Sequence, residues 1–284
     1  MPENASIILS DSASDDPFDD DDNAAIAQLL TDNVNNGSNT YTYEEITHND
    51  HGSSPPSIAS SINHDNVSTI IYPTNMQVRD YQLTTVQYAL FANVLCAIPT
   101  GLGKTFIAST VMLNFFNWTT SNMKIIFMAP TRPLVSQQIK AFVQITGISM
   151  IYADILLDKL KKNRGAIWDA KRVFFATPQV VENDLKSGLL APNSIALLVI
   201  DEAHRSKGNY AYTNVVKFLN RFNTSFRVLA LTATPGADIE SIQAVVENLN
   251  IQHIELRTES DEDIAKYIKT KEIQKLDCPP NDDI

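Results

Sequence analysis

The residues best suited to chemistry lie in one short loop, Pro99-Thr100-Gly101-Leu102-Gly103-Lys104-Thr105. The apolar run 94–98 before it predicts a short buried strand, and the run 106–113 after it, which lacks Gly and Pro, predicts a helix. This order of strand, glycine-containing loop, Lys-Thr and helix is typical of a phosphate-binding loop, because backbone N–H groups converge there on one anion. Lys104 would then reach the β- and γ-phosphates of ATP, and the Thr105 hydroxyl would bind Mg²⁺.

The loop departs from the full phosphate-binding pattern at one position. That pattern has a glycine five residues before Gly103, where this chain has Ile98. Gly101 and Gly103 still let the backbone curl without a Cβ clash. The alternative interpretation is a strand–helix turn that contains Gly-Leu-Gly-Lys-Thr and binds no nucleotide.

Two adjacent carboxylates, Asp201 and Glu202, directly follow the apolar run 195–200, which predicts a buried strand. Placing both charges at the end of a buried strand is costly unless a cation is present, and Mg²⁺ bound to ATP would supply one. Asp201 would hold the Mg²⁺, and Glu202 would orient and deprotonate the attacking water. The alternative is a strand-to-loop turn whose carboxylates are solvated.

Two further segments have polar groups that fit the same site. Thr232 and Thr234 follow the predicted strand 228–231, and their hydroxyls would link the carboxylates, through His204, to a surface that faces nucleic acid. Gln82 lies in a predicted helix from 79 to about 91, and its amide offers the donor and acceptor that suit the N6/N7 edge of adenine. Taken alone, the first segment is a loop with Pro and Gly, and the second is a solvated helix start.

Strands and helices alternate through the rest of the chain. The strands are short, β-branched and apolar on both faces, which is typical of a parallel sheet, so the predicted fold class is α/β with an open, doubly wound sheet. Ligands of such sheets bind at the carboxyl ends of the strands, and Lys104, Thr131, Thr177, Asp201 and Thr232 each follow a strand. Beyond the segments already given, the pattern predicts strands at 124–129, 148–152 and 173–176, and helices at 134–146, 153–168, 180–186, 212–222 and 239–249.

Composition limits the possible classes of protein. The 284 residues are 44% hydrophobic, which suffices for one large core or two modest ones, and no apolar run approaches the length of a membrane span. The first residues lack a signal peptide's basic and apolar regions, and two cysteines cannot make a disulfide framework or a structural zinc site. Residues 1–78 contain thirteen acidic and no basic residues, whereas 79–284 contain 22 basic and 20 acidic ones. The net charge of −11 therefore does not exclude an anionic partner for the second part.

Together these segments resemble the motifs of superfamily 2 helicases in order and approximate spacing. The Asp-Glu-Ala-His tetrapeptide followed by Arg205, and the Pro-Thr-Arg-Pro-Leu-Val segment, are closest to the FANCM/Hef family of DNA helicases and, within it, to the fungal branch. The resemblance runs from about Val78 to about Lys275 and rests on six segments: Arg79-Asp80-Tyr81-Gln82, Pro99–Thr105, Pro130–Leu134, Ala176–Gln179, Asp201–His204 and Thr232–Pro235.

The resemblance implies a RecA-like first motor domain that uses ATP and Mg²⁺ and acts on DNA without reading its sequence. It implies that Gln82 reads adenine, that His204, Thr232 and Thr234 couple hydrolysis to strand movement, and that Thr131, Arg132 and Thr177 contact the nucleic-acid backbone. Members of the family are nuclear, translocate 3′→5′ and remodel forks and displacement loops in DNA repair. The implied organisation is a disordered acidic tail over 1–70, the motor domain over 71–257 and a truncated linker over 258–284.

We find no segment that resembles the arginine-finger motif of a second motor domain. Because an arginine finger contributes about 10³–10⁵ in rate, we expect this chain alone to bind ATP weakly, to hydrolyse it barely and not to unwind duplex. Two alternatives to an active DNA helicase stay open: a truncated, non-functional chain with weak ATP and DNA binding, and an RNA-directed relative, since 2′-OH contacts cannot be read from motifs. A GTPase is disfavoured because the chain lacks an Asn-Lys-x-Asp motif.

Overall fold

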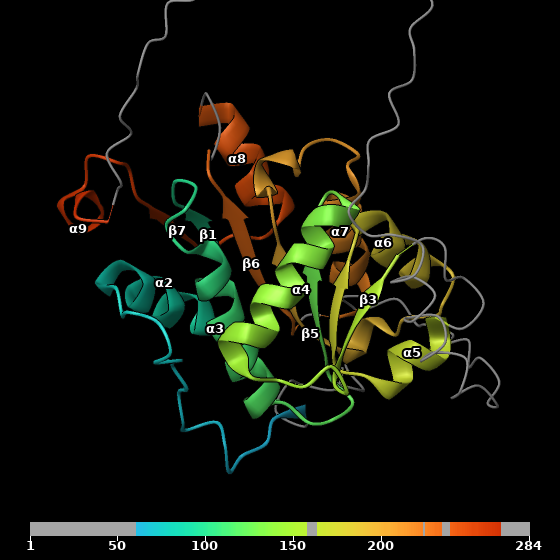
Figure 1. The fold of residues 1–284 in the computed structure, drawn as a ribbon. Coiled ribbons are helices and arrows are strands. Elements are labelled where there is room, and N and C mark those ends of the chain that lie inside the picture. Colours follow the sequence, from blue (N-terminus) through green and yellow to red (C-terminus); the bar gives the residue numbers. More distant parts are fainter. Residues whose placement is uncertain (1–60, 158–163, 224, 235–238, 268–284) are drawn as a thin grey trace, which may run out of the picture. The chain divides into compact units, whose positions relative to one another are not determined.

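The computed structural model describes residues 61–157, 164–223, 225–234 and 239–267, which all lie within one compact unit (Figure 1). The predicted acidic tail therefore lies outside the described residues except for 61–70, and so does the predicted linker after residue 267. These described segments contain the whole of the predicted chemistry, apart from the Pro-Gly that follows Thr234.

A seven-stranded parallel sheet forms the centre of the described part, in the order β3-β4-β2-β5-β6-β1-β7. Five of its strands are buried along nearly their whole length, which explains why their sequences are apolar on both faces. The doubly wound parallel sheet predicted from the sequence is confirmed. The strands are β1 (Val94–Ala97), β2 (Lys124–Met128), β3 (Ala153–Leu156), β4 (Val173–Ala176), β5 (Ile195–Ile200), β6 (Arg227–Thr232) and β7 (His253–Leu256).

Helices cover both faces of the sheet (Figure 1). On one face α2 (Asp80–Phe91), α3 (Lys104–Trp118) and α4 (Arg132–Thr146) pack side by side. The other face carries α6 (Pro178–Lys186), α7 (Ala211–Phe222) and α8 (Ile239–Asn248). Helix α5 (Arg164–Ala170) is tied to α6 by the Arg164–Asp184 ion pair. Three short helices complete the described part: η3 (Pro192–Ser194), η4 (Ala203–Arg205) and α9 (Glu262–Ala265).

The predicted strand at 148–152 is wrong. The structure has a turn there, closed by the Tyr152 N–H donating to the Ser149 carbonyl, and the strand is β3, which begins one residue later. Gly147, in the left-handed region at φ 70°, ends α4, so the chain leaves the helix into a turn. Ile151 in this turn is 73% exposed, which shows that the apolar run is not a buried strand.

The predicted helix over 153–168 is therefore also wrong in its first part, where β3 lies. Helix α5 begins only at Arg164, and residues 158–163 lie outside the described residues. A short strand between two helices cannot be separated from helix by periodicity when its flanks are also apolar.

Residues 61–71 contact the end of α3. Ile62 forms an isolated antiparallel bridge with Thr119, and the Trp118 indole N–H donates to the Thr69 carbonyl at 2.7 Å. The Asn114 amide bonds both the N–H and the carbonyl of Ile71, each at 2.7 Å. We therefore draw the start of the folded domain at residue 61 in the organisation proposed below, rather than at 71.

Candidate active site

The loop between β1 and α3 is shaped by two glycines in the left-handed region, Gly101 at φ 83° and Gly103 at φ 86°. Gly103 is the residue at which α3 starts, and Lys104 is the first residue of that helix. A Cβ on Gly103 would lie 2.1 Å from the Gln82 Nε2 atom, whereas a Cβ on Gly101 would meet nothing within 4 Å. The backbone conformation of Gly103 thus favours glycine, and a Cβ there would also displace the end of the Gln82 side chain.

Ile98 explains why the loop lacks the extra glycine of the full pattern. Its side chain is completely buried, and its N–H donates to the Thr232 carbonyl of β6 at 3.1 Å. At this position the chain still makes a hydrogen bond to the neighbouring strand, so its backbone does not have to adopt the left-handed conformation that favours glycine. The two glycines that follow are sufficient to turn the chain into α3.

Lys104 lies at the carboxyl edge with its ammonium turned onto the loop. Its Nζ atom donates to the carbonyls of Ile98 at 2.8 Å and Pro99 at 3.3 Å. Burial lowers the pKa of Lys104, and the nearby charges of Asp201 and Glu202 oppose that shift. The ammonium and the two carboxylates therefore share one electrostatic environment.

Asp201 and Glu202 come directly after β5. Asp201 is only 8% exposed, and burial raises the pKa of its carboxyl group; the adjacent Glu202 charge adds to the shift, while the Glu202 N–H bond at 3.0 Å and Lys104 oppose it. Glu202 adopts the left-handed region at φ 51°, which is uncommon for a residue with a side chain and turns the chain sharply after the strand. A buried carboxylate that accepts from the Glu202 N–H and lies beside a second carboxylate suits a divalent cation.

His204 joins this acidic turn to β6. Its Nδ1 atom lies 3.1 Å from the Thr232 hydroxyl and 3.4 Å from a Glu202 carboxylate oxygen. The Thr232 hydroxyl donates to the Thr234 carbonyl at 2.8 Å, so it must accept from His204, which assigns the proton to Nδ1. His204 thus contacts both Glu202 and the Thr232 hydroxyl, and Thr234 joins these contacts through its backbone carbonyl.

Gln82 lies against the glycine loop. Its Nε2 atom donates to the Leu102 carbonyl at 3.1 Å, and the Tyr81 hydroxyl donates to the same carbonyl at 2.7 Å. Arg79 donates to the Tyr81 hydroxyl at 3.0 Å, and Gln82 itself is only 4% exposed. The start of α2 is therefore tied directly to the loop.

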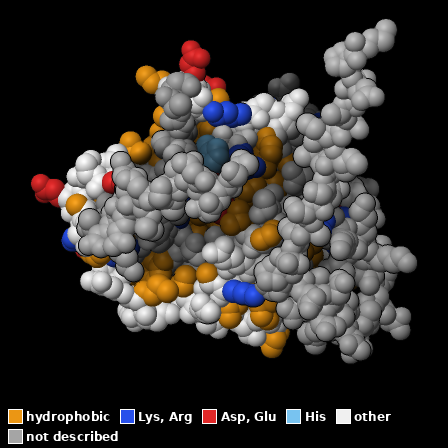
Figure 2. All heavy atoms as spheres, turned by 45° about the horizontal axis from the view of Figure 1, so that its top comes forward, with side chains coloured by type: hydrophobic (Ala, Val, Ile, Leu, Met, Phe, Trp, Pro, Cys, Tyr) orange, Lys and Arg blue, Asp and Glu red, His pale blue; other side chains and the backbone are white. Residues whose placement is uncertain are grey.

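Strand order sets the sequence of polar groups along this edge. From β4 through β2, β5 and β6 to β1, the residues after the strands are Thr177, Thr131, Asp201, the Thr232–Thr234 segment and the glycine loop. Thr131 and Thr177 are the N-cap residues of α4 and α6; Thr131 and Arg132 are exposed, whereas Thr177 is buried. Figure 2 turns the top of Figure 1 forward and shows lysine, arginine and acidic side chains scattered over apolar and uncharged surface. The residues expected to contact nucleic acid thus lie on one side of the carboxylates and the glycine loop on the other.

Tyr212 supports the site, although the sequence analysis did not single it out. Its hydroxyl donates to the Asp201 carbonyl at 2.7 Å, and burial raises the pKa of its phenol group. Tyr212 lies in α7, and no local pattern marks it; the one available signal was an apolar helix face with a single polar tip.

The described residues contain neither a membrane-spanning helix nor a metal-binding cluster. No helix among them is long and apolar enough to cross a membrane. The same residues contain no group of three or more His, Cys, Asp and Glu side chains that could hold a metal ion by themselves. A Mg²⁺ that is held by one or two protein ligands together with phosphates does not require such a group.

Comparisons with known proteins agree with the motifs. A family profile described as DEAD/DEAH box helicase matches residues 79–242. The ATP-dependent DNA helicase MPH1 of Saccharomyces cerevisiae strain YJM789 is 60% identical over 250 residues, which are 88% of this chain and 25% of that protein. MPH1 of Vanderwaltozyma polyspora is 64% identical over 213 residues, 75% of this chain and 21% of that protein. The chain thus spans about a quarter or less of these relatives.

Solved structures give the same family. The helicase domain of Pyrococcus furiosus Hef matches with a TM-score of 0.66 and 34% identity, covering 72% of this chain and 43% of that one. Saccharomyces cerevisiae Dbp5 matches with a TM-score of 0.52 and 18% identity over 63% of this chain and 48% of that one, which supports the fold alone. The RecA-like fold and the resemblance to the FANCM/Hef helicases are thereby confirmed.

Proposed function

Since this chain belongs to the DEAD/DEAH box helicase family, we propose that it is the ATP-binding motor portion of a FANCM-type DNA helicase. Its relatives are named ATP-dependent DNA helicases, and the chain covers only a fraction of their length. The proposed organisation is an acidic tail before residue 61, the first motor domain over 61–257, and a segment from 258 whose described residues, 258–267, pack against that domain.

One observation carries this proposal: Lys104 and the acidic pair Asp201 and Glu202 lie at the same edge of the sheet and influence each other's charge. The lysine follows β1 and the carboxylates follow β5, and β6 alone separates these strands. Such an edge has both a cation for phosphate oxygens and carboxylates for a phosphate-bound metal ion.

Each side chain has a proposed role. Lys104 binds the β- and γ-phosphates, and backbone N–H groups of Thr100–Thr105 donate to them. Thr105 and Asp201 have the hard oxygen donors that Mg²⁺ prefers, and when bound this ion would neutralise phosphate charge. Glu202 orients the attacking water and accepts its proton, and Gln82 binds the adenine edge.

The coupling and nucleic-acid roles follow the order along the edge. His204, Thr232 and Thr234 connect the acidic turn with the loop after β6, so a change at the nucleotide can reach that loop. Thr131, Arg132 and Thr177 lie beyond β5, and we assign them contacts with the phosphates of the strand. Movement in the 3′→5′ direction, remodelling of forks and displacement loops in DNA repair, and a nuclear location belong to the same proposal for the whole protein.

The test is the affinity for ATP in the presence of Mg²⁺, measured by titration calorimetry on the wild-type chain and on Lys104→Ala. A charge-assisted hydrogen bond contributes about 1.5–3 kcal/mol, so the substitution should weaken binding by about tenfold to a hundredfold. Lys217→Ala, on the exposed side of α7, is the matched control and should bind ATP as the wild type does. Equal affinity of Lys104→Ala and wild type would refute the proposal.

A second candidate is an RNA-directed ATPase, because the motifs do not distinguish the two nucleic acids. The names of the relatives, which are DNA helicases, favour DNA. Steady-state ATP hydrolysis with forked DNA and with duplex RNA separates the two: stimulation by RNA alone would favour the second candidate. The same assay measures the low turnover that we expect of this chain by itself, and turnover comparable to a complete helicase would contradict that expectation.

A further inference from the structure

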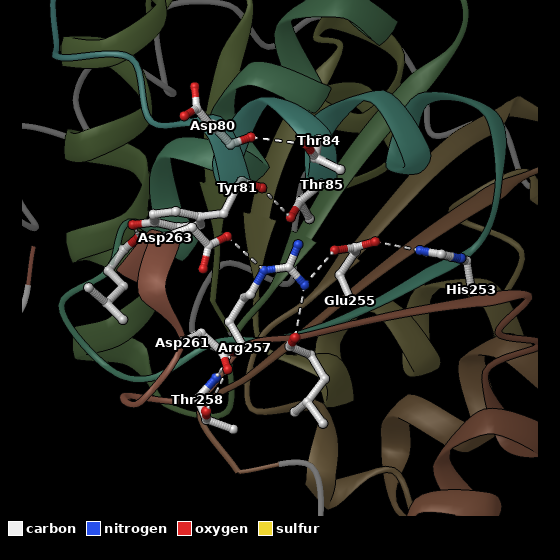
Figure 3. Close-up of polar contacts among 12 residues, drawn as sticks. Asp80, Tyr81, Thr84, Thr85, His253, Glu255, Arg257, Thr258, Asp261 and Asp263 are labelled. Carbon is white, nitrogen blue, oxygen red and sulfur yellow. Dashed lines mark hydrogen bonds and ion pairs between the residues drawn. The ribbon is translucent and has the colours of Figure 1, made fainter. Parts of the chain in front are cut away.

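The segment after β7 folds back onto the start of α2. Arg257 forms ion pairs with Glu255 on one side and Asp263 on the other, each at 3.2 Å, as Figure 3 shows. The Asp261 carboxylate accepts from the Thr258 N–H at 2.8 Å and from its hydroxyl at 3.0 Å, which closes the turn that precedes α9. This segment is thus held in a defined position next to the sheet.

Apolar contacts add to these bonds. Ile264 of α9 is completely buried in the core on the α2–α4 face of the sheet. The Tyr267 ring lies with its centroid 4.5 Å from the Arg79 guanidinium carbon and 6.0 Å from the centre of the Tyr81 ring. A guanidinium over an aromatic face at this distance is attracted by the ring's negative surface.

Arg79 and Tyr81 in turn reach the glycine loop. Arg79 donates to the Tyr81 hydroxyl, and Tyr81 donates to the Leu102 carbonyl, which also accepts from Gln82. Tyr267 therefore stands at the outer end of a chain of contacts whose inner end is the loop between β1 and α3.

We propose that Tyr267 is a positioning residue of the nucleotide site, acting through Arg79 and Tyr81 on Leu102 and on Gln82, which shares the Leu102 carbonyl. This rests on the proposed function, because it assigns a role at the ATP site. Without the Tyr267 ring, Arg79 gains rotamer freedom and leaves the Tyr81 hydroxyl more often. The glutamine amide is then less well fixed, so both affinity for ATP and preference for adenine over guanine decrease.

The same contacts couple the position of the segment after β7 to the glycine loop. Any displacement of α9 moves Tyr267 away from Arg79, and the loop is then held less firmly. Conversely, a nucleotide that fixes Leu102 and Gln82 favours the docked position of Tyr267, because the linkage is reciprocal. The chain that leaves the sheet therefore senses whether the nucleotide site is occupied.

The test uses the full chain and two fluorescent nucleotides, an N-methylanthraniloyl derivative of ATP and the corresponding derivative of GTP. The variants are Tyr267→Ala, Tyr267→Phe and, as the matched control, Tyr88→Ala, which removes a tyrosine ring from α2 that stacks on His253. A cation–π contact at a partly exposed site is worth about 0.5–1 kcal/mol, so Tyr267→Ala should weaken ATP binding by about two- to fivefold. It should weaken GTP binding less, and Tyr267→Phe and Tyr88→Ala should keep the wild-type ratio.

Two results would overturn the proposal: an unchanged ratio of ATP to GTP affinity in Tyr267→Ala, or an equal loss in Tyr267→Phe. Thermal unfolding of each variant establishes that it is folded, and Tyr267→Phe keeps the ring contact even if Tyr267→Ala does not fold. If the wild type and Lys104→Ala bind ATP equally, the proposed function fails rather than this inference.

Discussion

The contact between Gly103 and Gln82 yields the sharpest prediction, because the two loop glycines share a backbone conformation but differ in their surroundings. Gly101 and Gly103 have φ angles of 83° and 86°. Alanine at Gly101 would place its Cβ in open space, whereas alanine at Gly103 would place it 2.1 Å from the Gln82 Nε2 atom. The pair of substitutions therefore separates the cost of the backbone conformation from the cost of the steric clash.

The expected magnitudes follow from these contacts. Alanine in the left-handed region destabilises the folded state by about 1–2 kcal/mol. Because alanine also reduces the conformational entropy of the unfolded chain, it stabilises the folded state by about 0.4–1 kcal/mol. Gly101→Ala should therefore lower the free energy of unfolding by about 1 kcal/mol. Gly103→Ala must also displace the Gln82 amide from the Leu102 carbonyl. One lost hydrogen bond and a forced rotamer add about 1–2 kcal/mol, for a total of about 2–3 kcal/mol.

Urea denaturation followed by circular dichroism measures the free energy of unfolding of both variants, and titration with ATP measures their affinity. Gly103→Ala should lose affinity for ATP more strongly than Gly101→Ala, because it moves the side chain that we assign to adenine. The double variant Gln82→Ala with Gly103→Ala should recover part of the stability, since the smaller side chain leaves room for the new Cβ. Equal losses in the two single variants would show that the clash with Gln82 is not the reason for the glycine.

Three further predictions concern other contacts. Long-range nitrogen–proton NMR should find the His204 proton on Nδ1, and Thr232→Val should lower the free energy of unfolding by about 1–2 kcal/mol because it removes the acceptor of that proton. Burial lowers the pKa of Lys124 to about 8 against an ordinary value of 10.5, so the unfolded chain binds more protons between these values. Between pH 8 and 10 the wild type should therefore gain stability relative to Lys124→Met, and parallel pH profiles would contradict this. Asp184→Ala should cost about 3–5 kcal/mol in urea denaturation, because it leaves the buried Arg164 guanidinium unpaired.

The sequence predicted the sheet and most of its helices because the five central strands β1, β2, β4, β5 and β6 are apolar on both faces and alternate with helices. The candidate site residues were chosen from the same pattern: Asp201 directly follows β5, Thr232 ends β6, and Lys104 follows the loop after β1. The failure at 148–152 has a local cause. Three apolar residues of a turn resemble a strand in the sequence, and only the position of Gly147 at the end of α4 separates the two.

The contacts that position the candidate site could not be predicted from the sequence. Tyr212 reaches the Asp201 backbone from α7, and Tyr267 reaches Arg79 from a segment that lies 188 residues further along the chain (267 − 79). Periodicity marks Tyr212 as a core position, and nothing marks Tyr267, because its partner is fixed by the place of β7 beside β1 at the end of the sheet.

The order of the strands determines which motifs become neighbours at the edge of the sheet. Motifs far apart in sequence become neighbours because β5, β6 and β1 lie next to one another, so the acidic turn, the threonine loop and the glycine loop follow in that order. His204 bridges the first two, and Ile98 bonds the Thr232 carbonyl across to the third. Among these described contacts, Thr232 is therefore the only residue that touches both sides of the proposed nucleotide site. A nucleotide that pulls the acidic turn toward the glycine loop must act on β6 between them, so the loop after Thr232 is the part of this edge that we expect to move first.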